Sequence, residues 1–436
     1  MVSAVKGTND IFPGAGEVFL DSGMWEHIFA VAAEVLGGFG YHRVWLPVFE
    51  ETALFARGIG SDSDIVAKEM YTFADRGGRS LTLRPEATAG AVRAYVEHNL
   101  GRTDPVQRWW YGGPMFRAER PQKGRYRQFY QVGAELFGVA DPTSDAEMLL
   151  MLTRFCAALG LADTVVRLNS LGDAASRSAY REALTAYLRH RIRDGEPDTL
   201  CEPCTQRLDT NPLRILDCKR PGCRALVADA PDIAGYFSDA AQAHFAGVTD
   251  LLGQAGVTFV RDKRLVRGLD YYTGTIFEIT TGALGAQDAV CGGGRYDALV
   301  SLFGGPATPA VGFAAGVERM ALLLAQQNRQ VHGPDLYLVP LGERMGRETM
   351  GRAFVLADAI RRAGSYRVEV DLGAGRLKNR LRRGDKVGAR CALVLGEDEI
   401  AGGRGKLKSL RFSGEIEVML DGESIANALG EMLRRR

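Results

Sequence analysis

The apolar and polar positions along this chain alternate between helical spacing and short strand-like runs. Apolar residues recur every three or four positions in three long stretches, which is the spacing of amphipathic helices. Runs rich in β-branched and aromatic residues, bounded by glycine or proline, are typical of strands. The expected helices span 17–36, 143–159 and 174–193, and the expected strands span 41–49, 81–86 and 165–169.

Backbone hydrogen bonding adds expectations about where these elements lie and how they begin. Pro47 interrupts the 41–49 strand, and because proline has no N–H for a ladder, we expect this strand at a sheet edge. Thr88 follows the 81–86 strand and is expected to cap the next helix through its hydroxyl. Thr143 or Ser144 is expected to open the 143–159 helix in the same way.

Residues 108–138 predict a hairpin with an unusual loop. Its two arms are aromatic and apolar, and the eleven residues between them, 117–127, carry five basic side chains against the single acid Glu119. Guanidinium forks match phosphate oxygens bidentately, so a basic loop held between strands suits a polyphosphate. The alternative is a solvated hairpin tip, but such tips are normally short and rich in glycine. The loop therefore predicts a phosphate-binding site.

The second half of the chain contains two contrasting patterns. Residues 264–278 and 288–297 predict strands separated by glycine turns, and 310–326 predicts a strand that runs into a helix. A polar stretch at 327–334 then marks a domain boundary. Beyond it the expected order is strand, helix, strand, helix, strand, which favours a small α/β domain. The domains are predicted to span 1–326 and 334–436, with an insertion at about 165–260.

Composition changes this picture little. The chain has 436 residues with 46% hydrophobic and 25% charged residues, which is ordinary for a globular protein. Its net charge of +1 does not by itself indicate a nucleic-acid partner. The opening residues lack the apolar core of a signal peptide, and no apolar run approaches the ~20 residues of a membrane span. We therefore expect a cytoplasmic protein without a membrane partner, whose seven cysteines are mostly reduced.

Four of the cysteines fall in the expected insertion as two close pairs. The pairs are three and five residues apart in sequence, with thirteen residues between them. This spacing suits a closed tetrahedral zinc site that staples a segment too small for its own core. The alternative is four reduced thiols without a metal. The candidate ligands of a structural zinc ion are Cys201, Cys204, Cys218 and Cys223.

Three motifs connect the chain to a known family. The stretch FRAERPQKGRYRQF at 116–129 resembles motif 2 of the class II aminoacyl-tRNA synthetases. RGLDYY at 267–272 and CGGGRYD at 291–297 resemble two motifs specific to the histidyl-tRNA synthetase family within that class. The resemblance implies an α+β catalytic domain built on an antiparallel sheet, followed by a small α/β anticodon-binding domain.

The resemblance also implies an ATP site with magnesium. In it, Arg117 would contact the α-phosphate, Arg125 would reach toward the γ-phosphate, and Phe129 would stack on the adenine. Arg319, in the VERM sequence at 317–320, matches the arginine of motif 3 on the other adenine face. Glu119 matches the acid of motif 2. The alternative for Arg319 is an ordinary ion pair on its helix.

The amino-acid site carried over by the resemblance would bind L-histidine. Arg267 is the implied catalytic cation, which would bridge the α-phosphate and the substrate carboxylate, and Arg117 would join it in stabilising the charge that develops at the phosphorus. Glu135 would accept an imidazole N–H, and a pocket with acid and phenol groups rejects a ring that lacks both nitrogens. The other implied histidine-binding residues are Glu86, Thr88, Gln131, Tyr271, Tyr272 and Tyr296. The alternative for the tyrosines is a strand with core aromatic residues.

Transfer RNA is the third implied ligand. Gln122 and Arg127 in the basic loop would meet the acceptor end of tRNA(His), and the C-terminal domain would bind the anticodon. Gly384 departs from the family, which more often has alanine there. Because glycine inside a helix costs about 1 kcal/mol relative to alanine, we expect that helix to be bent or shortened.

The resemblance therefore implies an ATP-dependent, AMP-forming histidine–tRNA ligase that works as a homodimer. Two alternatives remain. One is a non-enzymatic, synthetase-like regulatory subunit of ATP phosphoribosyltransferase, although such proteins typically lose the catalytic arginines and the C-terminal domain. The other is a class II synthetase for another amino acid, which the RGLDYY motif at 267–272 argues against.

Overall fold

The computed structural model divides the chain into two compact units. The first gathers Met1–Asp10 and Ile28–Gln326, and the second gathers Ile11–His27 and Gln327–Arg436. The residues that the structure describes are 2–60, 63, 65–122, 124–161, 163–193, 200–284, 288–327, 333–342 and 346–434. Most of the predicted domain boundary, at 328–332, therefore lies outside the described residues.

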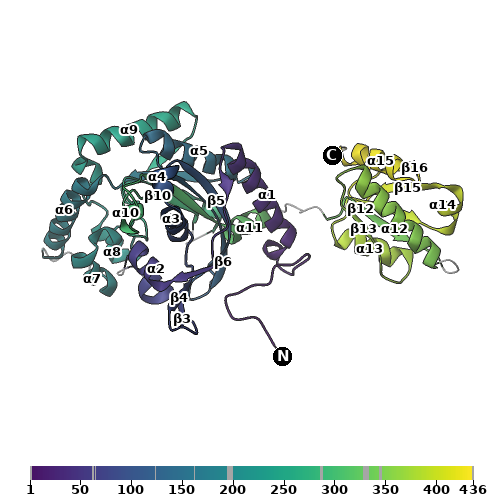
Figure 1. The fold of residues 1–436 in the computed structure, drawn as a ribbon, viewed down its shortest axis with the longest axis horizontal. Coiled ribbons are helices and arrows are strands. Elements are labelled where there is room, and N and C mark those ends of the chain that lie inside the picture. Colours follow the sequence, from purple (N-terminus) through teal and green to yellow (C-terminus); the bar gives the residue numbers. More distant parts are fainter. Residues whose placement is uncertain are drawn as a thin grey trace. The chain divides into compact units, whose positions relative to one another are not determined.

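An eight-stranded sheet forms the centre of the first unit (Figure 1). Its strand order is β1-β5-β6-β11-β10-β9-β7-β8, and the six central strands pair antiparallel, with a parallel pair at each edge. The predicted antiparallel sheet is therefore confirmed. The strands are β1 (His42–Arg43), β5 (Gln107–Phe116), β6 (Gln128–Phe137), β7 (Val165–Ser170), β8 (Val260–Arg261), β9 (Thr275–Thr280), β10 (Ala289–Arg295) and β11 (Ala310–Gly316).

The predicted hairpin is the antiparallel pair β5 and β6. Its ladder runs from Gln107 opposite Phe137 to Phe116 opposite Gln128. The loop 117–127 therefore leaves directly from the ends of two ten-residue strands. A second anchor comes from Gly7, whose carbonyl accepts the backbone N–H of Arg127 at 2.7 Å. The basic loop is thus held from both its strands and the N-terminal segment.

Two strand predictions need correction. The expected 41–49 strand is two short strands, β1 at the edge of the large sheet and β2 (Phe49–Glu51) in a separate sheet of order β2-β4-β3. Proline at position 47 lies between them, so the chain changes sheets where its ladder is interrupted. The expected 264–278 strand begins only at Thr275. The other strands of the small sheet are β3 (Tyr71–Ala74) and β4 (Ser80–Leu83).

Helices of the first unit pack around these sheets. The C-terminal part of α1 belongs to this unit, α5 packs on β11 and α9, and α2, α3 and α10 contact one another. Asp141, not Thr143 or Ser144, caps α5 by accepting the N–H of Thr143. The helices are α1 (Ser22–Gly38), α2 (Thr52–Ile59), α3 (Thr88–Glu97), α4 (Leu100–Thr103), α5 (Pro142–Ala158), α10 (Leu299–Leu302) and α11 (Val317–Gln326).

The segment between β7 and β8 is helical. Both strands extend the large sheet, so residues 165–170 and 260–261 belong to that sheet. Only the residues between them lie outside it. In Figure 1 helices α6, α7 and α8 lie together at one end of the unit. The helical elements are α6 (Ala174–Arg193), α7 (Glu202–Thr210), η3 (Pro212–Ile215), α8 (Pro221–Leu226), η4 (Ile233–Tyr236) and α9 (Asp239–Gln254).

The C-terminal residues form a five-stranded sheet of order β13-β12-β14-β15-β16 with helices packed on it. The first three strands are parallel and the last two antiparallel, so the predicted α/β order is confirmed. The elements are β12 (Leu336–Pro340), α12 (Gly346–Ala363), β13 (Val368–Val370), α13 (Leu377–Lys386), β14 (Cys391–Leu395), α14 (Glu397–Gly402), β15 (Arg404–Ser409), β16 (Glu415–Met419) and α15 (Gly422–Arg434).

Gly384 has a packing role that the sequence did not reveal. Helix α13 continues through it to Lys386, so the expected shortening is wrong. A β-carbon at position 384 would lie 2.7 Å from Cδ1 of Tyr337, which shows that the helix approaches β12 too closely for a side chain. Arg380 and Arg383 of α13 both pair with Asp371, which is buried. These two ion pairs therefore connect α13 to the residue that follows β13.

None of the helices among the described residues is long and apolar enough to cross a bilayer.

Candidate active site

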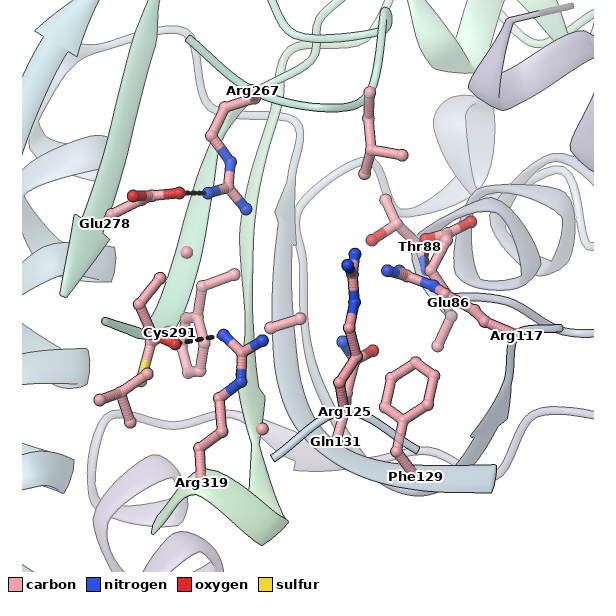
Figure 2. Close-up of a pocket in the computed structure, with 18 of the residues that line it drawn as sticks. Glu86, Thr88, Arg117, Arg125, Phe129, Gln131, Arg267, Glu278, Cys291 and Arg319 are labelled. Atoms are coloured by element: carbon pink, nitrogen blue, oxygen red, sulfur yellow. Dashed lines mark hydrogen bonds and ion pairs between the residues drawn. The ribbon is translucent and has the colours of Figure 1, made fainter. Parts of the chain in front are cut away.

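A cavity of about 440 Å³ opens on one side of the large sheet, and it is lined by Arg117, Arg125, Arg267 and Arg319. Figure 2 shows Arg117, Glu86 and Thr88 on one wall and Arg267, Glu278 and Arg319 on the other. These residues come from the β5–β6 hairpin, the start of α3 and the segment before it, β9 and the loop before it, and α11. Guanidinium groups from distant parts of the sequence therefore meet at one cavity.

Arg117 follows the last residue of β5 and lies deep in the wall. Its Nε donates to the carbonyl of Pro85 at 3.0 Å, and its guanidinium carbon lies 5.2 Å from the ring centre of Phe129. Burial lowers the pKa of Arg117, and Glu119 opposes this effect. An arginine stays protonated at neutral pH in any case, so this wall presents a fixed positive charge.

Arg125, on the same loop, pairs with Glu119. The backbone of Arg125 also exchanges two hydrogen bonds with Gln122, at 2.8 and 3.0 Å, which closes the tip of the loop. Glu119 is buried while the Arg125 side chain is 40% exposed, so the arginine reaches into the open cavity from a fixed partner.

Arg267 crosses the face of β10 and pairs with Glu278 of β9 (Figure 2). Its guanidinium occupies the space above Gly292, where a β-carbon would come within 2.5–2.7 Å of its atoms. This explains the first glycine of the CGGGRYD motif. Burial acts to lower the pKa of Arg267, but Glu278 and Tyr272 together raise it above its ordinary value.

Arg319 enters the cavity from the first turn of α11. It donates to the carbonyl of Gly124 at 3.3 Å and to the carbonyl of Ala289, while the neighbouring Glu318 accepts the backbone N–H of Tyr130 at 3.0 Å. Burial lowers the pKa of Arg319, and repulsion from Arg125 and Arg117 lowers it further. The three cations therefore lie close enough to repel, and an anion bound between them would relieve that repulsion.

Glu86 caps helix α3, and the expectation that Thr88 would do so is wrong. The Glu86 carboxylate accepts the backbone N–H groups of Thr88 at 2.6 Å and Ala89 at 3.0 Å. Thr88 is already the first helical residue, and its hydroxyl donates to Glu135 at 2.8 Å. A carboxylate at a helix N-terminus is favoured by the helix dipole, although burial raises the pKa of Glu86.

Glu135 lies beneath the cavity floor and is not one of its lining residues. It is fully buried and accepts three hydroxyl groups, from Thr88, from Tyr111 at 2.9 Å and from Tyr296 at 2.5 Å. Burial raises the pKa of Glu135 to about 8, against the opposing effect of these hydrogen bonds. The acid thus organises the hydroxyl groups that face the cavity.

Aromatic rings form one end of the cavity. The ring centres of Tyr271 and Tyr272 are 4.7 Å apart, and those of Tyr271 and Tyr296 are 5.7 Å apart. All three line the cavity, as does Gln131, whose side-chain oxygen is buried without a hydrogen-bond partner among the described residues. A buried amide oxygen is costly to leave unpaired, so the cavity suits a polar ligand that offers an N–H group to Gln131.

The predicted tRNA residues lie elsewhere on the loop. Gln122 and Arg127 are outside the cavity lining. Arg127 donates to the carbonyls of Glu119 and Lys6, each at 3.3 Å. The structure therefore separates these two residues from the candidate nucleotide site while keeping them on the same loop.

Sequence reasoning missed several residues of this cavity. Tyr111 gave no signal because it reads as one of several aromatic residues in a strand. Glu278 is the only charged residue of β9, and that exception within an apolar strand was a usable signal. Asp217 and Lys219 also line the cavity, although they are far in sequence from the motifs that carry its arginines.

The four cysteines of the predicted zinc site come together. Their sulfur atoms all lie within 4.8 Å of one another, and none of the four is disulfide-bonded. Cys204 and Cys223 are fully buried, whereas Cys201 and Cys218 are partly exposed. Thiolates in a closed set of four are the usual ligands of structural zinc, so the donor set fits that ion.

Comparisons with known proteins agree with the fold and the cavity. A family model described as histidyl-tRNA synthetase matches residues 21–320, and one described as anticodon binding domain matches 335–430. Proteins named histidine–tRNA ligase from Geobacter metallireducens and Geobacter sulfurreducens are each 47% identical over 426 residues, covering 98% of this chain and 99% of the relative. A crystal structure of apo S. aureus histidyl-tRNA synthetase is 32% identical, has a TM-score of 0.74, and covers 98% of this chain and 100% of that one.

The antiparallel sheet, its arginine-lined cavity and the small C-terminal domain define a class II aminoacyl-tRNA synthetase. Within that class, the chain belongs to the histidyl-tRNA synthetase family.

Proposed function

We propose that this protein joins L-histidine to tRNA(His) in two steps. ATP and histidine first give histidyl-adenylate and pyrophosphate, and the histidyl group then passes to the terminal ribose of the tRNA, releasing AMP. The observation that carries this proposal is the convergence of Arg117, Arg125, Arg267 and Arg319 on one cavity whose far end is lined by tyrosines. A triphosphate and a small nitrogen heterocycle fit those two ends respectively.

At the nucleotide end, we assign the phosphates to arginine. Arg117 holds the α-phosphate and Arg125 the γ-phosphate, with Glu119 as the partner that positions Arg125. Phe129 and Arg319 take the two faces of the adenine, which an aromatic ring and a guanidinium plane can both stack upon. Negative charge grows at the α-phosphorus during displacement, and fixed cations there lower the barrier.

At the histidine end, Arg267 bridges the substrate carboxylate and the α-phosphate, assisted by Gln131. Glu86 and Thr88 hold the α-ammonium, and Tyr271, Tyr272 and Tyr296 surround the imidazole. Glu135 accepts a ring N–H, which requires one of the three hydroxyl groups that now cover it to turn away. The histidine carboxylate oxygen then attacks the α-phosphorus, and pyrophosphate leaves.

Magnesium is expected to arrive with ATP. Carboxylates are the protein ligands that this hard cation prefers, and Glu119, Glu278 and Asp288 supply them around the cavity. The ion would neutralise charge on the phosphates. The residues present therefore fit a magnesium–nucleotide complex.

The other ligands use other surfaces. We assign Gln122 and Arg127 to the acceptor end of tRNA(His), and the C-terminal unit to the anticodon. We also propose a cytoplasmic homodimer, which membership of the histidyl-tRNA synthetase family favours. The retained arginines and the C-terminal unit favour the enzyme over a regulatory subunit of ATP phosphoribosyltransferase.

Amino-acid-dependent exchange of labelled pyrophosphate into ATP tests this function. We expect exchange with histidine and essentially none with threonine or proline. Exchange driven by either of the other two amino acids would replace the proposal with another class II activity. A purified protein that exchanges with no amino acid would support the regulatory alternative.

A further inference from the structure

We propose that Cys201, Cys204, Cys218 and Cys223 bind one zinc ion, and that this ion braces the histidine end of the cavity. The site is separate from the catalytic residues but connected to them by a short stretch of chain. The metal is therefore a structural ion, and its loss weakens the binding of substrate.

The sulfur geometry suits a tetrahedral ion. The sulfurs of Cys201 and Cys218 are 3.8 Å apart, and all four lie within 4.8 Å of one another. Zinc–sulfur bonds of ~2.3 Å in a tetrahedron place the sulfurs about 3.8 Å apart. A disulfide, by contrast, needs ~2.05 Å. The cluster is thus already close to the arrangement of a zinc tetrathiolate.

The local backbone brings the four sulfurs together. Cys201 immediately precedes α7, Cys204 lies in the first turn of α7, and Cys223 lies within α8. The backbone N–H of Cys201 points at the sulfur of Cys223, 3.2 Å away. Hydrogen bonds of this kind stabilise a thiolate, which is the form that binds a metal.

Charge in the surrounding segment complements such a centre. One zinc ion with four thiolates carries a net charge of −2. Residues 200–226 contain five Lys and Arg against three Asp and Glu, a surplus of two positive charges. The net charge of this segment is therefore about zero when the metal is bound.

The connection to the active site runs through Cys218. Its sequence neighbours Asp217 and Lys219 both line the cavity, and they form an ion pair at 3.0 Å. A metal that fixes the Cys218 sulfur therefore fixes the short stretch of backbone that presents both side chains to the ligand.

Two hydrogen bonds extend this brace to the RGLDYY motif. Asn211 donates to the Asp270 carboxylate at 3.0 Å, and Arg214 donates to the carbonyl of Gly268 at 2.9 Å. These contacts lie next to Arg267 and Tyr271, which line the cavity. The segment between the cysteine pairs thus supports the loop that holds the proposed catalytic cation.

A common hydrophobic core completes the link. Cys204, Cys223 and Ile215 belong to the same cluster of buried residues as Tyr271 and Tyr272. The helices α7 and α8 have only nine and six residues, so they contribute little core of their own. Small elements of this kind depend on a staple, and the metal supplies it.

Metal content is the first test. The full-length protein, purified without added metal, should contain about one zinc per chain by plasma mass spectrometry. A Cys201→Ala/Cys218→Ala variant should contain less than about a tenth of that amount. A matched Cys156→Ala/Cys391→Ala variant, which removes two buried cysteines elsewhere, should keep its zinc. Absence of zinc from the unmodified protein, or iron in its place, would overturn the site.

The brace has its own test, which rests on the proposed function. The zinc-free variant should show a rise of about tenfold in KM for histidine with a smaller change in KM for ATP, because Asn211 and Arg214 bond to the motif that carries Arg267 and Tyr271, which we assign to histidine. Arg214→Ala should keep its zinc yet raise the same KM, and limited proteolysis should cut 200–226 only in the zinc-free protein. An unchanged KM for histidine in both variants would refute the brace. Failure of all histidine-dependent exchange in the unmodified protein would refute the proposed function while leaving the zinc measurement valid.

Discussion

The guanidinium of Arg267 and a β-carbon at position 292 cannot occupy the structure together. Gly292 lies on β10 directly beneath Arg267, and an added β-carbon would approach Nη2 to 2.5 Å and Nη1 to 2.6 Å. Real β-carbons do not come this close to another heavy atom, so a substitution must displace the arginine. The glycine is therefore part of what positions the proposed catalytic cation.

Gly292→Ala should consequently lower histidine-dependent pyrophosphate exchange by about 10²-fold, since a displacement of ~1 Å in a reacting geometry costs that much. The fold should survive, because the arginine is a side chain that can move. Gly253→Ala, in α9 with open space around it, is the matched control and should exchange normally. A Gly292→Ala enzyme with normal exchange would show that Arg267 acts from another position.

Arg267→Ala should reduce exchange by at least about 10³-fold, since a cation at the α-phosphorus acts in the transition state. Arg267→Lys should recover little of this loss, because an ammonium group cannot bridge a carboxylate and a phosphate bidentately. Arg264→Ala, three residues earlier and exposed, is the control. Thermal unfolding should change little in all three variants, and near-normal exchange in Arg267→Ala would contradict its role.

The C-terminal unit should depend strongly on one buried acid. Asp371 is 2% exposed and pairs with both Arg380 and Arg383. Asp371→Asn leaves the buried Arg380 without its counter-charge and should cost about 3–5 kcal/mol in the free energy of unfolding. Asp358→Asn removes an exposed pair with Arg362 and should cost at most about 1 kcal/mol. Equal losses in the two variants by denaturant unfolding would count against this assignment.

Glu135 should make stability depend on pH. Burial raises its pKa from 4.5 to about 8 in the folded protein, so the folded state binds a proton that the unfolded state has released. Its contribution to stability is complete below about pH 4.5 and is lost as pH rises to about 8. Glu135→Gln removes the titration, so its thermal midpoint should fall less than that of the parent between pH 6 and pH 9. Parallel pH profiles for the two proteins would contradict the raised pKa.

The sequence predicted well those parts of the fold that depend on local pattern. The β5–β6 hairpin, the strand and helix of 310–326, and the α/β order of the C-terminal unit all follow from apolar spacing. The predicted strand at 264–278 was wrong in its first part. Residues 264–274 are as apolar as a strand but form a loop before β9. Apolar content alone does not distinguish a core loop from a strand.

The site was predictable where a motif carried it. Arg117, Arg267 and Arg319 were found in this way, and all three line the cavity. Contacts that depend on folding distant segments together were not predictable. Lys219 reaches the cavity only because its segment packs against residues 265–272, and Glu135 accepts hydroxyl groups from Thr88 and Tyr296, which are far from it in sequence. No spacing in the sequence encodes either arrangement.

The ion pairs of the cavity have a consequence for how a nucleotide enters it. Arg125 is held by Glu119, and Arg267 by Glu278, so each of these cations already has an anionic companion. Arg125 and Arg267 therefore meet a triphosphate with their side chains already oriented by a carboxylate. Nucleotide binding then adds phosphate contacts to arginines that keep their acidic partners, and these two carboxylates also offer oxygen atoms to the cation that travels with the nucleotide.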